Sequence, residues 1–209
     1  MRRPVSFSVA LALLACSARV QAQEISDPLP EVGESPGGDV GDRELGATIG
    51  AAIATGRVTP GGLRVAGRYI YQVTDVDWFD FGLGFTFGSG DAGCMRDADD
   101  QLICDHGAAE GAAIDLFGGV RRFFGAQEGF RPWLRTGVGA RLTHFADDEL
   151  TGGSVVLSLG GGVRARIDDR IAVGGHAALE LGAGVFGNDY GAAVQLGMTV
   201  GADVEFVLP

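Results

Sequence analysis

The sequence predicts an all-β protein, a closed eight-stranded antiparallel transmembrane β-barrel. Three observations lead to this fold class. Apolar and polar residues alternate with a period of two from Glu44 to the end of the chain, as in strands that have one apolar face. A signal for export precedes this region. After that signal, no apolar run approaches the roughly 20 residues that a membrane-spanning helix requires.

The export signal is the stretch MRRPVSFSVALALLACSARVQAQE. It has two arginines, an apolar run from Val5 to Cys16, and Val20 and Ala22 at the small-residue spacing that signal peptidase reads. We therefore expect a signal peptide over residues 1–22. The alternative is that LLAC acts as a lipoprotein box and that Cys16 is acylated, which would anchor the chain to a membrane.

The next segment, residues 23–43, is acidic and rich in proline and glycine, so we expect it to be disordered. The barrel is expected over residues 44–209. The 36 glycines are spread through strand-like runs, and the 7 prolines are too few for a collagen-like chain. The net charge of −11 disfavours nucleic acid as a partner. Without Cys16, Cys94 and Cys104 remain as an even pair, which predicts a disulfide in an oxidising compartment.

Eight strands are expected, each long enough to cross a bilayer as a tilted strand. They cover about residues 44–57, 63–73, 78–88, 112–124, 131–145, 154–167, 170–186 and 192–206. With the N-terminus on the periplasmic side, the longest connection, residues 89–111, is external, as outer-membrane barrels require. The short external connection VTPGG after the first strand fits this rule less well.

The two faces of these strands differ in chemistry. One face is apolar, and in residues 77–91 it carries phenylalanine at four alternate positions. The other face combines glycine with nearly every strand charge, and we expect it to line the barrel. The residues expected to form ion pairs in the interior are Arg64, Arg68, Asp80, Asp115, Arg121, Arg135, Arg141, Arg164, Arg166, Glu180, Asp203 and Glu205, and Glu44 and His176 share this face.

The direction of the apolar face separates two kinds of barrel. A soluble, lipocalin-like barrel would bury this face, but the interior of eight strands has little room for its phenylalanines and large aliphatic residues. Paired charges and glycines would fit that space, since arginine pairs well with carboxylates. We also expect aromatic belts at both ends: Tyr69, Tyr71, Phe79, Trp133 and Phe206 at the inner end, and Phe85, Phe87, Phe145 and Phe186 at the outer end.

In this pattern the chain resembles the small outer-membrane β-barrel families, the eight-stranded group that includes the OmpA transmembrane domain, OmpX and OmpW. The final strand, AAVQLGMTVGADVEFVLP, resembles the insertion signal of these families, and Phe206 would be its aromatic residue. The family ends on the aromatic itself, whereas three residues follow Phe206 here. The resemblance implies location in the outer membrane of a Gram-negative cell. It also implies lipid, lipopolysaccharide and the barrel insertion machinery as partners of a monomer.

Four patterns are candidates for chemistry, and each has a simpler explanation. GAGVFG, residues 182–187, matches a dinucleotide fingerprint but lies inside a strand, where its glycines would relieve crowding. His176 and Glu180 are about 13 Å apart along a strand, too far for an acid–base pair. His144, close to three acidic residues, lies where barrel lipid deacylases have their site, but no His-x-Ser pair is present. Asp97, Asp99, Asp100 and Asp105 are candidate ligands of a weak calcium site, for which a solvated acidic loop is the simpler explanation.

The expected function is therefore that of an integral outer-membrane protein with a structural or surface-interaction role and an interior plugged by ion pairs. No enzyme activity and no cofactor are expected. The loop pinned by Cys94 and Cys104 is the expected contact surface. The alternatives are a narrow pore, a barrel enzyme that acts on membrane lipid, and a soluble ligand-binding barrel.

Overall fold

The computed structural model describes residues 40–55, 57–90, 93–96, 102–106, 108–125, 129–187 and 190–209. The expected signal peptide, Cys16 and most of the expected disordered segment lie outside these ranges, as do Asp97, Asp99 and Asp100. No helix in the described ranges is long and apolar enough to cross a membrane.

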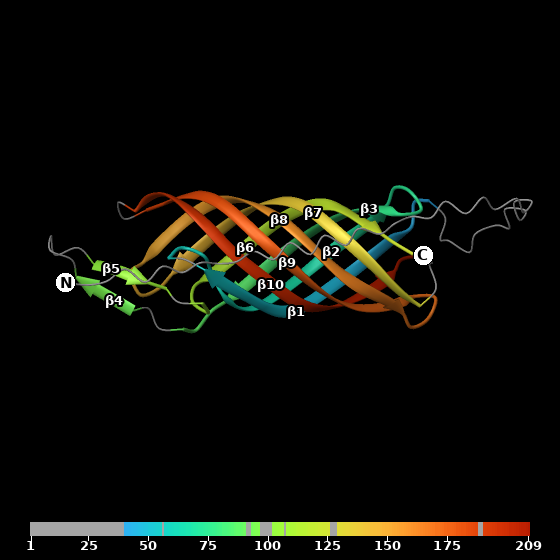
Figure 1. Ribbon diagram of the computed structural model, residues 1–209, viewed down its shortest axis with the longest axis horizontal. Helices are drawn as coiled ribbons and strands as arrows, with labels where there is room; N and C mark the ends of the chain where they lie inside the picture. Colours follow the sequence, from blue (N-terminus) through green and yellow to red (C-terminus); the bar gives the residue numbers. More distant parts are fainter. Residues whose placement is uncertain are drawn as a thin grey trace, which may run out of the picture. The chain divides into compact units, whose positions relative to one another are not determined.

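Eight strands form a closed antiparallel barrel in the order β1-β10-β9-β8-β7-β6-β3-β2 (Figure 1). Their bounds are β1 Arg43–Thr55, β2 Gly62–Gln72, β3 Asp77–Phe87, β6 Ala112–Phe123, β7 Phe130–Phe145, β8 Leu150–Arg166, β9 Ile171–Phe186 and β10 Gly191–Val207. β10 pairs with β1, from Val207 opposite Glu44 to Leu196 opposite Thr55. The sheet therefore has no open edge.

The expected fold class is confirmed, and the observed strands match the expected ones with small shifts at their ends. The largest shift is in β8, which begins at Leu150 because Leu150 to Gly153 continue the ladder with β7. The expectation missed a small hairpin in the long connection, β4 (Gly93–Arg96) paired with β5 (Leu102–Asp105). These strands have four residues each, too few for a periodic pattern to stand out.

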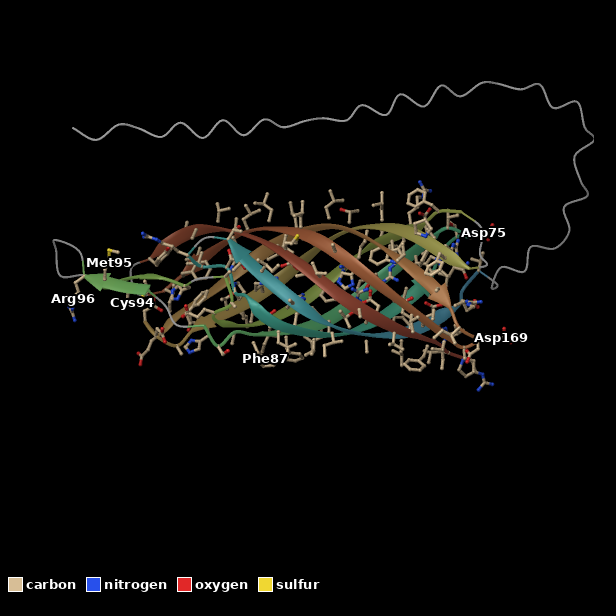
Figure 2. All side chains as sticks on the ribbon, turned by 60° about the horizontal axis from the view of Figure 1, so that its bottom comes forward. Asp75, Phe87, Cys94, Met95, Arg96 and Asp169 are labelled. Atoms are coloured by element: carbon tan, nitrogen blue, oxygen red, sulfur yellow. A yellow bond between two sulfur atoms is a disulfide. The ribbon has the colours of Figure 1, made fainter. Side chains whose placement is uncertain are left out.

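The barrel has two distinct ends. We call the end that carries the β1–β2, β3–β6, β7–β8 and β9–β10 connections the loop end, and the end with the other connections and the C-terminus the turn end. The β4–β5 hairpin projects from the loop end, and Cys94, Met95 and Arg96 lie there beyond the barrel strands (Figure 2).

Apolar side chains cover the outside of the barrel. Leu116, Leu157 and Val185 are 66%, 58% and 67% exposed, and Phe79, Phe81 and Phe87 of β3 are also exposed. The alternate positions point inward, where Glu44, Asp80 and Arg121 are fully buried. The apolar row of β3 therefore faces away from the barrel axis.

Apolar side chains also close the inside of the barrel at both ends. Ile70, Trp78, Phe123 and Trp133 form a buried cluster at the turn end, which we call the inner plug. Val58, Phe145, Leu150 and Phe186 form a second cluster at the loop end, the outer plug. Charged side chains occupy the space between the plugs.

The plugs correct part of the expected aromatic belts. Trp133, Phe145 and Phe186 are 4%, 0% and 3% exposed, so they face the interior. The alternation itself requires this position, since Leu134 and Leu142 of β7 and Leu181 and Val185 of β9 face outward. Tyr69, Tyr71, Phe79, Phe87 and Phe206 are on the outside, as expected, and so is the half-buried Phe85.

Glycine makes room for large side chains in the interior. A Cβ atom on Gly82 of β3 would lie 2.3 Å from the ring of Phe117, which fills the lumen beside it. A Cβ atom on Gly182 would lie 3.0 Å from Gln195 Oε1. Gly182 and Gly184 of the fingerprint-like motif thus lie in β9 and relieve crowding, whereas Gly187 follows the strand.

Candidate functional site

The charged lumen between the two plugs is the candidate functional site. Its ion pairs form two groups, one nearer to each end of the barrel. The group nearer the loop end joins four strands through Arg64, Asp115, Arg141 and Glu180. Arg141 places Nε 2.5 Å from Asp115 Oδ1 and Nη2 2.5 Å from Glu180 Oε2. Arg64 pairs with Asp115 and lies 4.0 Å from Glu180, so two cations and two anions balance.

Asp80 is the centre of the group nearer the turn end. Its Oδ2 atom lies 2.9 Å from Arg121, 3.2 Å from Arg135 and 3.8 Å from Arg68. The Asp80 side chain is completely buried. One carboxylate of β3 thus holds arginines from β6, β7 and β2.

Further carboxylates share these arginines. Arg121 lies 2.5 Å from Glu205, which in turn lies 3.3 Å from Arg164. Arg164 reaches Glu44 at 2.5 Å. The chain of pairs crosses the lumen and connects strands that are not neighbours in the sheet.

Asp203 completes this group with two further partners. Thr48 donates a hydrogen bond to its Oδ1 atom at 2.6 Å, and His176 Nδ1 lies 2.7 Å from Oδ2. Arg68 lies 3.6 Å from the same carboxylate. His176 and Glu180 are therefore in different groups, as their separation along β9 implies.

The lumen holds equal numbers of arginines and carboxylates. Six arginines (Arg64, Arg68, Arg121, Arg135, Arg141, Arg164) face six carboxylates (Glu44, Asp80, Asp115, Glu180, Asp203, Glu205). The assignment of Arg166 to the interior was wrong. Arg166 is exposed at the turn end of β8, because the lumen ends one residue pair earlier, at Arg164. Without Arg166, and with Glu44 included through its pair with Arg164, both signs are present in equal numbers.

The balance matters because burial of an unpaired charge is costly. A buried ion pair repays the loss of hydration only where the geometry is good, and loss of one partner costs about 3–5 kcal/mol. The inner plug adds aromatic contacts, with Arg121 lying 4.4 Å above the ring of Trp133. These contacts fix the arginine between a carboxylate and an aromatic face.

A small cavity of about 50 Å³ remains in the middle of the lumen. Arg64, Arg68, Arg135, His176 and Glu180 are among the residues that line it. Arg135 Nη2 is buried and has no hydrogen-bond partner in the described part of the chain. The volume suits a few water molecules and is too small for a ligand of drug size.

The other candidate residues lie outside the lumen. Phe206 is on the apolar outer face of β10 and is 46% exposed. Asp105 is in β5, while the other expected calcium ligands lie outside the described ranges. His144 is exposed on β7, and its Nδ1 atom lies 2.9 Å from Thr151 Oγ1. In the described part of the chain, no group of three or more histidine, cysteine, aspartate or glutamate side chains is arranged so that it could hold a metal ion.

The expected disulfide between Cys94 and Cys104 is present and closes the β4–β5 hairpin. His106, to which no role was predicted, is fully buried at the loop end. A signal for it exists in the sequence, because Glu110 follows four residues later in an otherwise small and apolar stretch.

Comparison with solved structures shows a shared fold. Neisserial surface protein A (NspA) matches with a TM-score of 0.58 and 10% identity, over 78% of this chain and 96% of the other. The N-terminal β-barrel domain of Pseudomonas aeruginosa OprF matches with a TM-score of 0.44 and 15% identity, over 80% and 99% of the two chains. A de novo designed transmembrane β-barrel matches with a TM-score of 0.35 and 15% identity, over 80% and 96%.

No protein-family model and no curated protein matches the sequence. At 10% identity, the likeness to NspA concerns the fold. It agrees with the closed barrel that the resemblance to small outer-membrane barrels implies.

Proposed function

We propose that this chain is an integral outer-membrane barrel with a sealed interior, whose role is structural or is carried by its external loops. The observation that carries the proposal is the direction of the two faces. Large apolar side chains are exposed around the barrel while arginines and carboxylates are buried inside it. A surface of this kind is stable against acyl chains and unstable in water.

The interior supports a sealed barrel over a pore. The inner and outer plugs occupy the two ends of the lumen, and ion pairs fill the space between them. A water-filled path would have to displace both plugs. We therefore expect no stable conductance when the purified protein is added to a planar bilayer, and a reproducible open level would refute the sealed interior.

The loop end supports a surface role. The β4–β5 hairpin is held by a disulfide and exposes Met95, which is 68% accessible. Such a covalently fixed projection loses little conformational entropy on contact with another surface. We propose this hairpin as the contact surface, with lipopolysaccharide and the insertion machinery as further partners of a monomer. The pairing of β1 with β10 within one chain supports the monomer.

The location can be tested by cell fractionation. The protein should be recovered from outer membranes, and its mobility in gel electrophoresis should change when the sample is boiled. A substitution in the apolar band adds a physical test. Leu157 lies in the middle of β8 and is 58% exposed, so Leu157→Arg should destabilise an inserted barrel by about 2–4 kcal/mol.

Val73→Arg is the matched control, since Val73 is exposed in the β2–β3 connection at the turn end, where the expected cost is about 0–1 kcal/mol. A soluble barrel would tolerate both arginines equally. Recovery of the protein in the soluble fraction, or equal stability of the two variants, would rule out insertion.

A further inference from the structure

A short segment between β5 and β6 is bound to the rim of the barrel at the loop end. We call residues 106 and 108–111 the strap. Its carbonyl groups accept hydrogen bonds from the rim: Ala54 N donates to Ala108 O at 3.1 Å, Gly61 N to Glu110 O at 2.9 Å, and Gly88 N to Gly111 O at 2.7 Å. A Cβ atom on Gly61 would lie 2.0 Å from Ala108 O, so the rim and the strap are in close contact.

The strap reaches the opposite side of the mouth through His106. Its backbone bonds are to the end of β1, to the β1–β2 connection and to the residue that follows β3. The imidazole contacts Asp148 in the connection between β7 and β8, strands that lie opposite β1 and β2 in the barrel order. The ring also stacks on Phe145 of the outer plug, with 3.9 Å between centroids and 22° between planes. The strap thus lies across the outer plug.

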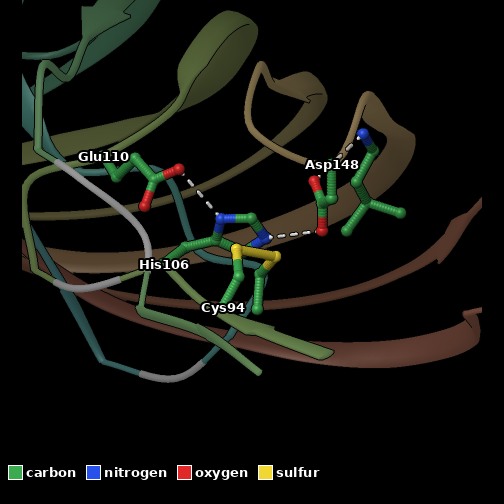
Figure 3. The surroundings of a disulfide bond; sticks show 6 residues. Cys94, His106, Glu110 and Asp148 are labelled. Carbon is green, nitrogen blue, oxygen red and sulfur yellow. Dashed lines mark hydrogen bonds and ion pairs between the residues drawn. A yellow bond between two sulfur atoms is a disulfide. The ribbon is translucent and has the colours of Figure 1, made fainter. Parts of the chain in front are cut away.

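His106 lies between two carboxylates (Figure 3). Nδ1 is 3.0 Å from Glu110 Oε1, and Nε2 is 3.2 Å from Asp148 Oδ2. The contact between Nε2 and Asp148 Oδ2 is short enough for an ion pair, but its angles are not those of a hydrogen bond. Both carboxyl groups are at most 16% exposed in their side chains, and the imidazole is not exposed at all. The two carboxylates come from different parts of the chain, Glu110 from the strap itself and Asp148 from the β7–β8 connection.

The number of protons in this cluster follows from its geometry. A neutral imidazole has one N–H group and one nitrogen lone pair. With both carboxyl groups ionised, the lone pair would face a carboxylate oxygen at about 3 Å without a proton between them, and a buried polar group would be unsatisfied. Both contacts are favourable only when the cluster holds a second proton, as an imidazolium between two carboxylates.

We propose that the strap is a proton-dependent lid in which His106, Glu110 and Asp148 take up one proton when the lid closes over the outer plug. By linkage, a lower pH favours the closed lid as long as the carboxyl groups stay ionised. A rise in pH removes the proton and releases the strap. Histidine is the side chain whose unperturbed charge change falls between about pH 5 and pH 8, so this is the pH range to test.

Hydrogen–deuterium exchange of the full-length protein in detergent micelles can test the lid. The amides of Ala54, Gly61 and Gly88 report closure, because each donates to the strap. Their protection factors, which correct for the intrinsic effect of pH, should fall at least about fivefold between about pH 5.5 and about pH 8. Gly187 N is the internal reference, since it donates to Thr151 O at the same end of the barrel.

Two substitutions separate a proton-dependent lid from a merely structural histidine. In Glu110→Gln the carboxamide can donate to the ring nitrogen, so a neutral imidazole satisfies both partners. This variant should keep the protection and lose its dependence on pH, and Asp148→Asn should act in the same way. His144→Gln, which removes the exposed histidine at the same end, should behave as the wild type.

The outcomes are clear in either direction. Protection factors that are equal at both pH values in the wild type would overturn the proposal, even if a variant fails to fold. A dependence on pH that persists in both carboxamide variants would also overturn it. The measurement does not depend on where the protein is located in the cell.

Discussion

Asp80→Asn is the sharpest test of the ion-paired lumen. The substitution keeps the size of the side chain and removes the charge that three arginines share. Arg121 would retain Glu205 at 2.5 Å, and Arg68 would retain Asp203 at 3.6 Å. Arg135 has no other carboxylate within ion-pair distance among the described residues, so one buried cation would lose its compensation.

The magnitude follows from that single uncompensated arginine. Breaking a buried pair by removal of one partner costs about 3–5 kcal/mol, so the free energy of unfolding should fall by this amount. Tryptophan fluorescence during urea unfolding in lipid vesicles would measure the change. Trp78 and Trp133 are both in the inner plug close to Asp80, which makes the signal local to the site.

Asp77→Asn is the control on the same strand. Asp77 pairs with Arg122 at 2.8 Å at the turn end, but the two side chains are 27% and 57% exposed. Loss of this ion pair should lower the free energy of unfolding by about 0–1 kcal/mol. The double variant Asp80→Asn/Arg135→Met removes the Arg135 cation together with the Asp80 carboxylate, so the lumen again has equal numbers of arginines and carboxylates. Part of the lost stability should therefore return. Equal losses for Asp80→Asn and Asp77→Asn would refute the electrostatic account of the lumen.

Other predictions concern packing and the loop end. Gly82→Ala should destabilise the barrel by about 1–3 kcal/mol, because the new methyl group meets the Phe117 ring, whereas Gly67→Ala, with open space around its Cβ, should change the unfolding midpoint little. The Cys94→Ser/Cys104→Ser variant should leave barrel unfolding unchanged, since the bridge closes only the hairpin. Amide exchange in the hairpin should become faster, because the free energy of local opening should fall by up to about 2–3 kcal/mol. Destabilisation by Gly67→Ala, or a fall in barrel stability on loss of the disulfide, would contradict these assignments.

Much of the fold could be predicted because a barrel strand shows its two environments at alternate positions. Leu157 and Ser158, or Phe79 and Asp80, already differ in the way that an apolar outside and a polar inside demand. The same rule places Trp133 and Phe145 inside. The predicted aromatic belts misplaced these two residues, because the prediction used their position along the strand and ignored which face of the strand they occupy.

The pairing inside the lumen could not be predicted in the same way. Which arginine meets Asp80 depends on the register of four strands and on how side chains cross the barrel axis, and neither is encoded in a single strand. His106 was missed for a related reason. Its partner Asp148 is 42 residues away in sequence, and only closure of the barrel brings the two loops together.

The contact between β1 and β10 has a consequence for biogenesis. The first strand to leave the ribosome finds its second neighbour only when the last strand has arrived, as the bond between Thr48 and Asp203, 155 positions apart, illustrates. Until then every intermediate exposes two unpaired strand borders. The seam between β1 and β10 therefore cannot close before β10 has been delivered.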